Sequence, residues 1–460
     1  MFSRWILAAY FFFLSLYSKR FAYLAISIRG FPLFISELTL LAVFFLRARR
    51  LRYVSLPRRV LLFLFAFAGW GLVRLAWSFA EGTANRSNLM ETLQQSAIFY
   101  QSAWILVPLL FRIDDVRAFF SSALAGAAVA QFLGWVGFLL MGRYEAKNSF
   151  LIGFPVGNEM ILPLFPFVFL LWNYPWALLG CFTYGQLWMT QFVIYMKRAW
   201  VFCCLVFGLP LLFFPPRARR RKFLLGFLLA LVISGFSAWG GLLWVKDRPV
   251  PIVYHSIERE SVAQRQKFSA FTRLLLQMVD KVYPFTEVLF TDVTAGQIIF
   301  KGDLKEGKDF APTSFIAFRF HLWKQTWSSF KARPWIGQGF GGHIFETQLN
   351  GSPAAVEGKW ISGPHNSFLS ILARLGIVGA SLFLGLVWAC LGGLLKHFRH
   401  LTTLDWMILA AVGSAHFFAF FNVCLENPQS GIWYWFFLGA AALAALSKTP
   451  SYQRSPEDPK

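Results

Sequence analysis

Charged residues and pairable cysteines are both scarce in this sequence. Only 14% of the 460 residues are charged, and none of the five cysteines belongs to a C-x-x-C pair. All five lie within apolar runs, so the sequence predicts neither a disulfide framework nor a cysteine metal site. No Asp-x-Asp motif or metal-ligand spacing is present, which predicts a protein without a catalytic metal, although Glu258, Glu260 and Glu426 leave an oxygen-ligated ion open.

Acidic residues are outnumbered by basic ones, 22 to 44, which gives a formal net charge of +22. Such an excess can indicate nucleic-acid binding. Here, however, the arginines are spread over short clusters between apolar runs, where anionic lipid headgroups already explain them. We therefore expect membrane lipids, and no nucleic acid, as partners.

Long apolar runs dominate the sequence, because 57% of its residues are hydrophobic and 19% are aromatic. This composition indicates an all-α, polytopic membrane protein with about twelve transmembrane helices. The helices are expected at residues 3–17, 30–46, 59–80, 93–111, 116–141, 157–172, 176–195, 199–214, 223–245, 366–394, 404–423 and 431–447.

The distribution of arginine and lysine predicts the orientation of these helices. An even number of crossings places both ends of the chain on one side, and the loops on that side hold the basic clusters at 47–59, 217–222 and 396–399. Because positively charged loops stay in the cytoplasm, both termini are expected there. Arg4 precedes an apolar run with no small-residue cleavage site, so this run is expected to be an uncleaved first helix.

One long segment interrupts the pattern of short loops. The predicted organisation is helices 1–9 in residues 1–245, a mostly helical outer segment in 246–364, helices 10–12 in 365–447 and a cytoplasmic tail in 448–460. Within the outer segment, apolar residues recur at helical spacing over 258–280. This pattern is typical of an amphipathic helix, which would lie on the membrane or pack on the rest of the segment.

His365 stands at the mouth of the tenth predicted helix, on the expected outer face. Ser362 can cap a first turn and Pro364 suits an early helical position, so the helix is expected to begin here with His365 in its first turn. Free N–H groups and the helix dipole at that place favour a bound anion and a neutral imidazole. The side chain is a candidate base, although a histidine that only hydrogen-bonds at a helix start would look the same.

Lys197 and Arg198 lie in the short turn between the seventh and eighth predicted helices, on a side where few cations are expected. A guanidinium there could bind two phosphate oxygens at once, or it could reach the lipid headgroups. Arg319 opens a predicted helix that precedes the glycine-rich stretch 333–342. This stretch lacks the Gly-Lys-Ser/Thr ending of a Walker loop, so its glycines are expected to form turns and not a phosphate cradle.

Three motifs occur in order in the second half of the chain. They are Arg319-x-x-x-Trp323, then Pro334-Trp-Ile-Gly-x-Gly-Phe-Gly341, then His365-Asn366-x-x-Leu369 followed by Gly376. Together they resemble the O-antigen ligase and O-antigen polymerase family of bacterial envelope glycosyltransferases. Weaker matches are Asn158, before a proline-rich span, and Lys197-Arg198-Ala-Trp200, where the family more often has Ser-Arg-Gly. The resemblance covers about residues 150–440 and implies a C-type glycosyltransferase fold in the bacterial inner membrane.

The resemblance implies a metal-independent, inverting glycosyltransferase that needs no cofactor. Its donor would be an undecaprenyl-pyrophosphate-linked glycan at the periplasmic face, with His365 as the general base and with Arg198 and Arg319 on the pyrophosphate. Further candidates for substrate binding are Lys197, Asn366, Asn158, His321 and Glu426. Branches of the family transfer the glycan to lipid A-core, extend the glycan or attach it to protein serine or threonine. The long outer segment favours the lipid A-core ligase.

A small-ion transporter is the alternative of another class. Glu37, Arg74 and His416 lie within predicted helices, where charged or titratable groups can line an ion pathway. A transporter should carry such groups near the midplane and paired across repeats. The candidate site residues of this chain are instead expected at one face of the membrane. A transferase is therefore the favoured hypothesis.

Overall fold

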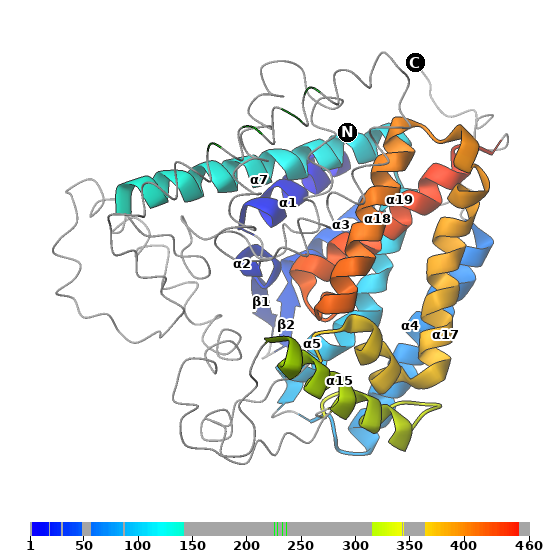
Figure 1. Ribbon diagram of the computed structural model, residues 1–460. Helices are drawn as coiled ribbons and strands as arrows, with labels where there is room; N and C mark the ends of the chain where they lie inside the picture. Colours follow the sequence, from blue (N-terminus) through cyan, green and yellow to red (C-terminus); the bar gives the residue numbers. More distant parts are fainter. Residues whose placement is uncertain are drawn as a thin grey trace.

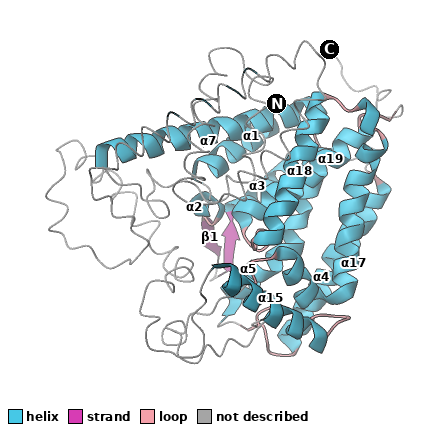
Figure 2. Cartoon of the chain, in the orientation of Figure 1, coloured by secondary structure: helices cyan, strands magenta, loops and turns pink. Residues whose placement is uncertain are grey.

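The computed structural model describes residues 2–17, 19–28, 31–47, 57–85, 88–141, 315–342, 344 and 364–449, together with the helical positions 225, 228, 232 and 236. Most of these residues are helical (Figure 2). The spans predicted at 157–172, 176–195 and 199–214 lie outside them, as do residues 246–314, 343 and 345–363 of the predicted outer segment.

The described elements follow one another in the order that the labels of Figure 1 give. The first are α1 (Phe2–Tyr17), α2 (Lys19–Ala22), β1 (Ala25–Ile28), β2 (Phe31–Phe34), α3 (Ile35–Arg47) and α4 (Arg58–Ala80). Next come α5 (Leu89–Tyr100), the 3-10 helix η3 (Gln101–Ile105), α6 (Leu106–Leu109) and α7 (Ile113–Met141). The second half of the chain adds α15 (Phe315–Ala332), α17 (Ser367–Lys396), the 3-10 helix η8 (Phe398–His400), α18 (Thr403–Phe421) and α19 (Pro428–Leu446).

Four helices, α4, α17, α18 and α19, are long and apolar enough to cross a membrane, and they correspond to the predicted spans 59–80, 366–394, 404–423 and 431–447. With 30 residues, α17 is about 45 Å long, against about 30 Å for the hydrocarbon core of a bilayer. Figure 1 shows α4 and α17 side by side. The protein is therefore a helical membrane protein.

The ends of these four helices meet in the way that the predicted orientation requires. Gly385 of α17 lies against the Phe63 ring and Gly379 against Trp70, so α4 and α17 run antiparallel. Lys448, just beyond α19, forms a 2.7 Å ion pair with Asp405 in the first turn of α18. One end of the bundle therefore gathers the start of α4, the end of α17, the start of α18 and the end of α19.

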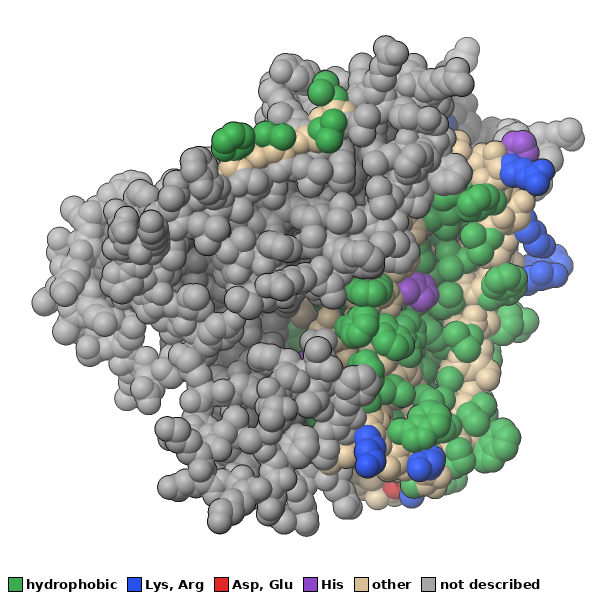
Figure 3. All heavy atoms as spheres, in the orientation of Figure 1, with side chains coloured by type: hydrophobic (Ala, Val, Ile, Leu, Met, Phe, Trp, Pro, Cys, Tyr) green, Lys and Arg blue, Asp and Glu red, His purple; other side chains and the backbone are tan. Residues whose placement is uncertain are grey.

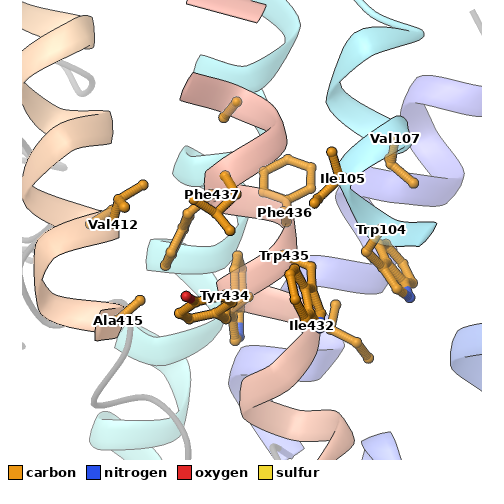
Figure 4. Close-up of a cluster of buried hydrophobic side chains, with 14 of the residues drawn as sticks. Trp104, Ile105, Val107, Val412, Ala415, Ile432, Tyr434, Trp435, Phe436 and Phe437 are labelled. Atoms are coloured by element: carbon orange, nitrogen blue, oxygen red, sulfur yellow. The ribbon is translucent and has the colours of Figure 1, made fainter. Parts of the chain in front are cut away.

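Helix α19 is the most deeply buried of the four spans. Figure 4 shows its side chains packed between α18 on one side and the η3–α6 segment on the other. Trp433, Tyr434 and Trp435 are each at most 1% exposed, and Gly439 lies so close to the Ile105 carbonyl that a Cβ would overlap it. Because lipid tails are as apolar as these side chains, close packing holds such a helix in place in a bilayer.

The span predicted at 30–46 is wrong at its start, and the prediction of an all-α fold omits a small sheet. Residues 25–28 and 31–34 form an antiparallel pair in which Ala25 lies opposite Phe34, and α3 begins only at Ile35. Pro32 disfavours a helix through this stretch, while the β-branched Ile26 and Ile28 favour a strand.

The span predicted at 93–111 is a broken helix. Its first part, α5, passes at Gln101 into η3 and then into α6. Pro108 contributes to this break, because proline removes an N–H group and its ring clashes with the carbonyl four residues earlier. Beyond α6 the chain bends by 120° into α7.

Helices α1 and α7 run parallel to each other. Arg4 forms a 2.9 Å ion pair with Asp115, and Ser122 Oγ donates to the Ala8 carbonyl at 2.6 Å, so both helices advance together. Figure 1 shows the pair lying across the direction of α4 and α17.

Large hydrophobic side chains are exposed along α4 and α17. Leu62 and Phe65 on α4 are 67% and 65% exposed, and Leu384 and Trp388 on α17 are 63% and 69% exposed. On the face that Figure 3 shows, the visible lysines and arginines lie towards the two ends of this hydrophobic surface. Such a surface is suited to contact with lipid.

Candidate functional site

Helix α17 is kinked at Gly376, whose φ of 67° and ψ of −169° are not helical. The kink separates residues 367–375, which we call the half-helix, from the rest of α17. In a regular helix the N–H groups of Ile377 and Val378 would bond to the carbonyls of Ala373 and Arg374. The kink releases all four groups, and buried backbone groups need other partners.

The glycine-rich loop, residues 333–342, supplies those partners. The bonds are Ile377 N to Pro334 O (2.8 Å), Val378 N to Trp335 O (3.3 Å), Gln338 N to Ala373 O (2.7 Å) and Gly339 N to Arg374 O (3.0 Å). The carbonyl of Leu375 is also released, and it accepts from the Trp70 indole on α4 at 2.9 Å. The loop and the kink therefore satisfy each other's backbone groups.

The hydrogen bonds between the glycine-rich loop and the kink of α17 depend on glycine in both segments. Gly337, Gly339 and Gly341 have φ values of 71°, 83° and 78°, in the left-handed region that favours glycine. A Cβ at Gly337 would overlap the backbone carbonyl of Arg374, and a Cβ at Gly376 would overlap that of Trp335. Only glycine combines a positive φ with so close a backbone approach.

Helix α4 holds the glycine-rich loop from the other side. Arg74, which is 1% exposed, donates from Nη2 to the Gly337 carbonyl at 3.0 Å. One turn later, Ser78 Oγ accepts from the Phe340 N–H at 2.8 Å. The amino-terminal third of the chain therefore takes part in positioning the motif.

An exposed ion pair joins the same loop to the end of α4. Arg333 Nη1 lies 2.9 Å from Glu81 Oε1, just after the last turn of α4. A hydrogen bond from Trp77 and the Arg333 guanidinium hold the pKa of the Glu81 carboxyl below its ordinary value. Exposed pairs of this kind contribute little to stability, so this one mainly fixes where the loop begins.

His365 has a φ of 51°, the only positive value at a non-glycine residue in the described part of the chain. For a residue with a Cβ this left-handed conformation costs about 1–2 kcal/mol, although histidine adopts it more readily than most residues do. The side chain is partly exposed. Backbone strain of this kind is concentrated at functional sites.

The helix start predicted at Ser362, with His365 in the first turn, is wrong. Asn366 is the N-cap of α17, and its Oδ1 accepts from the Leu369 N–H at 3.0 Å. Asparagine caps a helix as well as serine does, and the left-handed φ of His365 prevents the helix from starting earlier. His365 therefore precedes the helix. Asn366, predicted to bind substrate, is 3% exposed and uses its Oδ1 for the cap.

Helix α15 is tied to the chain next to His365. The Trp323 indole donates to the Pro364 carbonyl at 2.9 Å. Arg319 lies four residues before Trp323 on α15, which is one helical turn, and His321 lies between them. The side chains of Arg319 and His321 are outside the described part of the structure.

A buried ion pair lies at the end of the half-helix. Arg374 is 0% exposed and Glu426 is 3% exposed, and Arg374 Nε lies 3.5 Å from Glu426 Oε1. Glu426 was predicted to bind substrate, but this burial against Arg374 favours a structural role. Arg374 was not among the predicted site residues, although a cation within an apolar run is itself a signal of function.

The remaining predicted residues divide into two groups. Arg198, Lys197 and Asn158 lie outside the described residues. His416, suggested for an ion pathway, is bonded within the bundle: Nδ1 lies 2.9 Å from the Val412 carbonyl and Nε2 lies 3.1 Å from the Tyr434 hydroxyl. Across the described ranges, no group of three or more His, Cys, Asp or Glu side chains could hold a metal ion.

Comparison with known proteins agrees with the motifs. No curated protein matches the chain. The family model described as O-antigen ligase matches residues 187–384, a range that contains Arg198, α15, the glycine-rich loop, His365 and the half-helix. The protein is therefore a helical membrane protein that is similar to the O-antigen ligase family over residues 187–384.

Proposed function

We propose that this protein transfers a glycan from an undecaprenyl-pyrophosphate carrier to the lipid A-core oligosaccharide at the periplasmic face of the bacterial inner membrane. The family match over residues 187–384 supports this class of reaction. The observation that carries the proposal is His365, a partly exposed histidine in a strained conformation, located between α15 and the half-helix.

The proposed reaction is a single displacement at the anomeric carbon. His365 accepts the proton of the acceptor hydroxyl as the hydroxyl oxygen attacks that carbon. The bond from the anomeric carbon to the pyrophosphate oxygen breaks, the anomeric configuration inverts, and the leaving pyrophosphate carries away the negative charge. A base is needed because a sugar hydroxyl is a poor nucleophile until its proton is removed.

In this proposal, fixed cations stabilise the leaving pyrophosphate. Arg198 and Arg319 bind the pyrophosphate and stabilise the charge that develops on it, with Lys197 as a helper. A guanidinium suits this task because its planar fork can hold two phosphate oxygens at once. No metal is required, since the arginines already supply the positive charge.

The setting of His365 supports a chemical role. The Asn366 cap fixes the residue that follows it, and the bond from Trp323 to Pro364 fixes the residue that precedes it. A base that is held on both sides meets its substrate without first having to be ordered. The half-helix N-terminus next to it also favours an anionic substrate group.

The ion-transport alternative has less support. Arg74 is bonded to the glycine-rich loop, and His416 is bonded to Val412 and Tyr434, so both residues have structural tasks in the described part of the chain. Within the family, polymerase and protein-glycosylating activities use the same donor chemistry. The acceptor offered in the assay separates them from the ligase.

The test is glycan transfer by the purified protein from an undecaprenyl-pyrophosphate donor, with lipid A-core, free glycan or a serine-containing peptide as acceptor and a chelator present. His365→Asn tolerates a left-handed φ but cannot take the proton, so transfer should fall by about a hundredfold to ten-thousandfold while donor binding persists. His365→Gln and His365→Ala should fail as well. His400→Asn, at an exposed histidine beyond α17, is the matched control and should transfer normally.

Near-normal transfer by His365→Asn or His365→Gln would remove His365 from the role of base. His321 and His343, two histidines of the predicted outer segment, would then be the next candidates. Transfer to free glycan or to peptide, but not to lipid A-core, would leave the glycosyltransferase class in place and overturn the assignment as a ligase.

A further inference from the structure

Arg374 is a fully buried cation in a helix that faces lipid along other parts of its surface. Its exposure is 0%, and its Nε lies 3.5 Å from Oε1 of the buried Glu426. The free energy needed to remove two charges from water often exceeds their mutual attraction. Well-packed hydrophobic residues at the same place are therefore often at least as stabilising. A buried ion pair is therefore not expected to stabilise the protein by itself. Its presence here suggests that it holds the half-helix in one specific position.

The guanidinium binds the glycine-rich loop directly. Arg374 Nη1 lies 3.3 Å from the Gly339 carbonyl and 3.4 Å from that of Gly342, and it donates to Gln95 Oε1 at 2.7 Å. The same Oε1 atom accepts from the Gly341 N–H at 2.7 Å. One side chain therefore joins the half-helix, the glycine-rich loop and α5.

The half-helix is attached at both ends to the same short connection, residues 422–427, between α18 and α19. At its start, Ser367 Oγ donates to the Asn422 carbonyl at 2.9 Å and accepts from the Leu425 N–H at 3.3 Å. At its end, Arg374 faces Glu426 of that connection. The kink at Gly376 uncouples this unit from the rest of α17, so these attachments determine its orientation.

We propose that Arg374 is a positioning residue: by binding Glu426, Gln95 and the loop carbonyls it fixes the half-helix, and thereby fixes His365, which lies two residues before Ser367. The part of this inference that concerns His365 rests on the proposed function. Gln95 and Glu426 are the partners through which the effect is exerted. Because Arg374 is fully buried, we assign it an indirect effect through His365 and not a contact with substrate.

The test compares the full-length parent with Arg374→Lys and with the double variant Arg374→Met/Glu426→Leu in lipid nanodiscs. Lysine keeps the charge but loses the planar fork, whereas the double variant removes both charges of the Arg374–Glu426 pair together. Arg399→Lys, at an exposed arginine of η8, is the matched control.

Three readouts are needed: hydrogen–deuterium exchange of residues 336–342, the rate at which diethyl pyrocarbonate modifies His365, and the kinetics of glycan transfer. In both variants we expect the loop amides to exchange about tenfold faster, while α18 and α19 exchange at the parental rate. The modification rate of His365 should change by at least about threefold. Because a displacement of about 1 Å can cost a hundredfold, kcat should fall by about that factor, with the KM for the donor within about twofold of the parent.

The proposal would be overturned if, in the double variant, residues 336–342 exchange hydrogen at the same rate as in the parent and kcat is also unchanged. Faster loop exchange with unchanged kcat and unchanged His365 modification would overturn it too, because the contacts would then not reach the histidine. Faster exchange in every helix would indicate a role in general stability and would also contradict it. If the parent itself transfers no glycan, the proposed function fails, while exchange and His365 modification still decide the positioning role.

Discussion

His365 and Asn366 are adjacent residues with different tasks. The first adopts a strained, left-handed conformation with a partly exposed side chain, and the second is buried and spends its Oδ1 on the cap of α17. The sequence motif His-Asn alone does not separate these tasks, because both side chains can serve substrate or structure. The separation requires the φ of His365 and the bond to Leu369.

Substitution of Asn366 tests this division. Asn366→Ala should lower the free energy of unfolding by about 1 kcal/mol, because one N–H of the first turn loses its acceptor. Asn366→Ser can replace the cap and should retain both stability and donor binding. Thermal melting and donor binding in detergent are the measurements. If Asn366→Ser melts normally but no longer binds the donor, the amide contacts substrate after all.

The two arginines proposed for the pyrophosphate are tested by keeping their charge. Arg319→Lys and Arg198→Lys should each impair transfer although expression and folding stay normal, because a point ammonium cannot reproduce the guanidinium fork. The measurement is the KM for the donor together with kcat. Arg117→Lys, at an exposed arginine of α7, is the control. Parental transfer by both lysine variants would show that these arginines only reach the lipid headgroups.

At the scale of the elements, α17 and the glycine-rich loop behave as one structural unit. Each supplies the backbone partners that the other lacks, and glycine is required where they meet. The sequence predicts turns for the glycines of 333–342, Gly337 among them, and contains Gly376 only as part of a motif. It does not predict that the two positions contact each other, because a backbone contact between distant segments leaves no local pattern.

Two glycines of α17 make a matched pair for testing this unit. Gly376→Ala should destabilise the protein by about 2 kcal/mol or more, since it combines a positive φ with overlap on the Trp335 carbonyl. Gly392→Ala should be neutral or stabilising by up to about 1 kcal/mol, because a Cβ there meets nothing closer than 3.5 Å and alanine favours a helix. Denaturation midpoints measure both. Equal midpoints would show that the kink is not specified by Gly376.

The four clearest spans could be predicted to within a few residues, as the predicted 59–80 and the observed Arg58–Ala80 illustrate. Long apolar runs carry that information locally. The hairpin at residues 25–34 and the break at Gln101 could not, because both sit inside apolar stretches whose hydropathy does not distinguish strand or 3-10 helix from α-helix. For the proposed site, the motif indicates His365, whereas the role proposed for Arg374 depends on Gln95 of α5 and on Glu426 in the connection between α18 and α19, which are distant in sequence.

At the scale of the whole molecule, the two ends of the helical bundle differ in what they hold. One end has the start of α4 and the end of α17, with Arg58, Arg59 and Lys396. The other end has α15, the glycine-rich loop and His365, joined to α4 through Glu81. Since α17 is long enough to cross a bilayer, we expect these two ends on opposite sides of the membrane.

The positive-inside rule decides which end is cytoplasmic. Lys324 and Lys331 of α15 lie at the His365 end, so cations occur at both ends of the bundle. They belong, however, to the long predicted segment 246–364, and long segments are translocated largely regardless of charge. The short loops carry the topological signal, and their clusters at 47–59 and 396–399 predict that the His365 end faces the periplasm.

The last prediction tests this orientation with single cysteines in a background whose five native cysteines are replaced by alanine. Ser328→Cys lies on the exposed side of α15, and Arg399→Cys lies beyond the opposite end of α17. An impermeant thiol reagent should label Ser328→Cys, and also Gly302→Cys in the predicted outer segment, in intact spheroplasts. It should label Arg399→Cys only after lysis. Because both positions are exposed, a failure to react reports sidedness and not burial. The reverse pattern would place His365 in the cytoplasm and exclude transfer at the periplasmic face, whereas labelling of both cysteines in intact cells would mean that α17 does not cross the membrane.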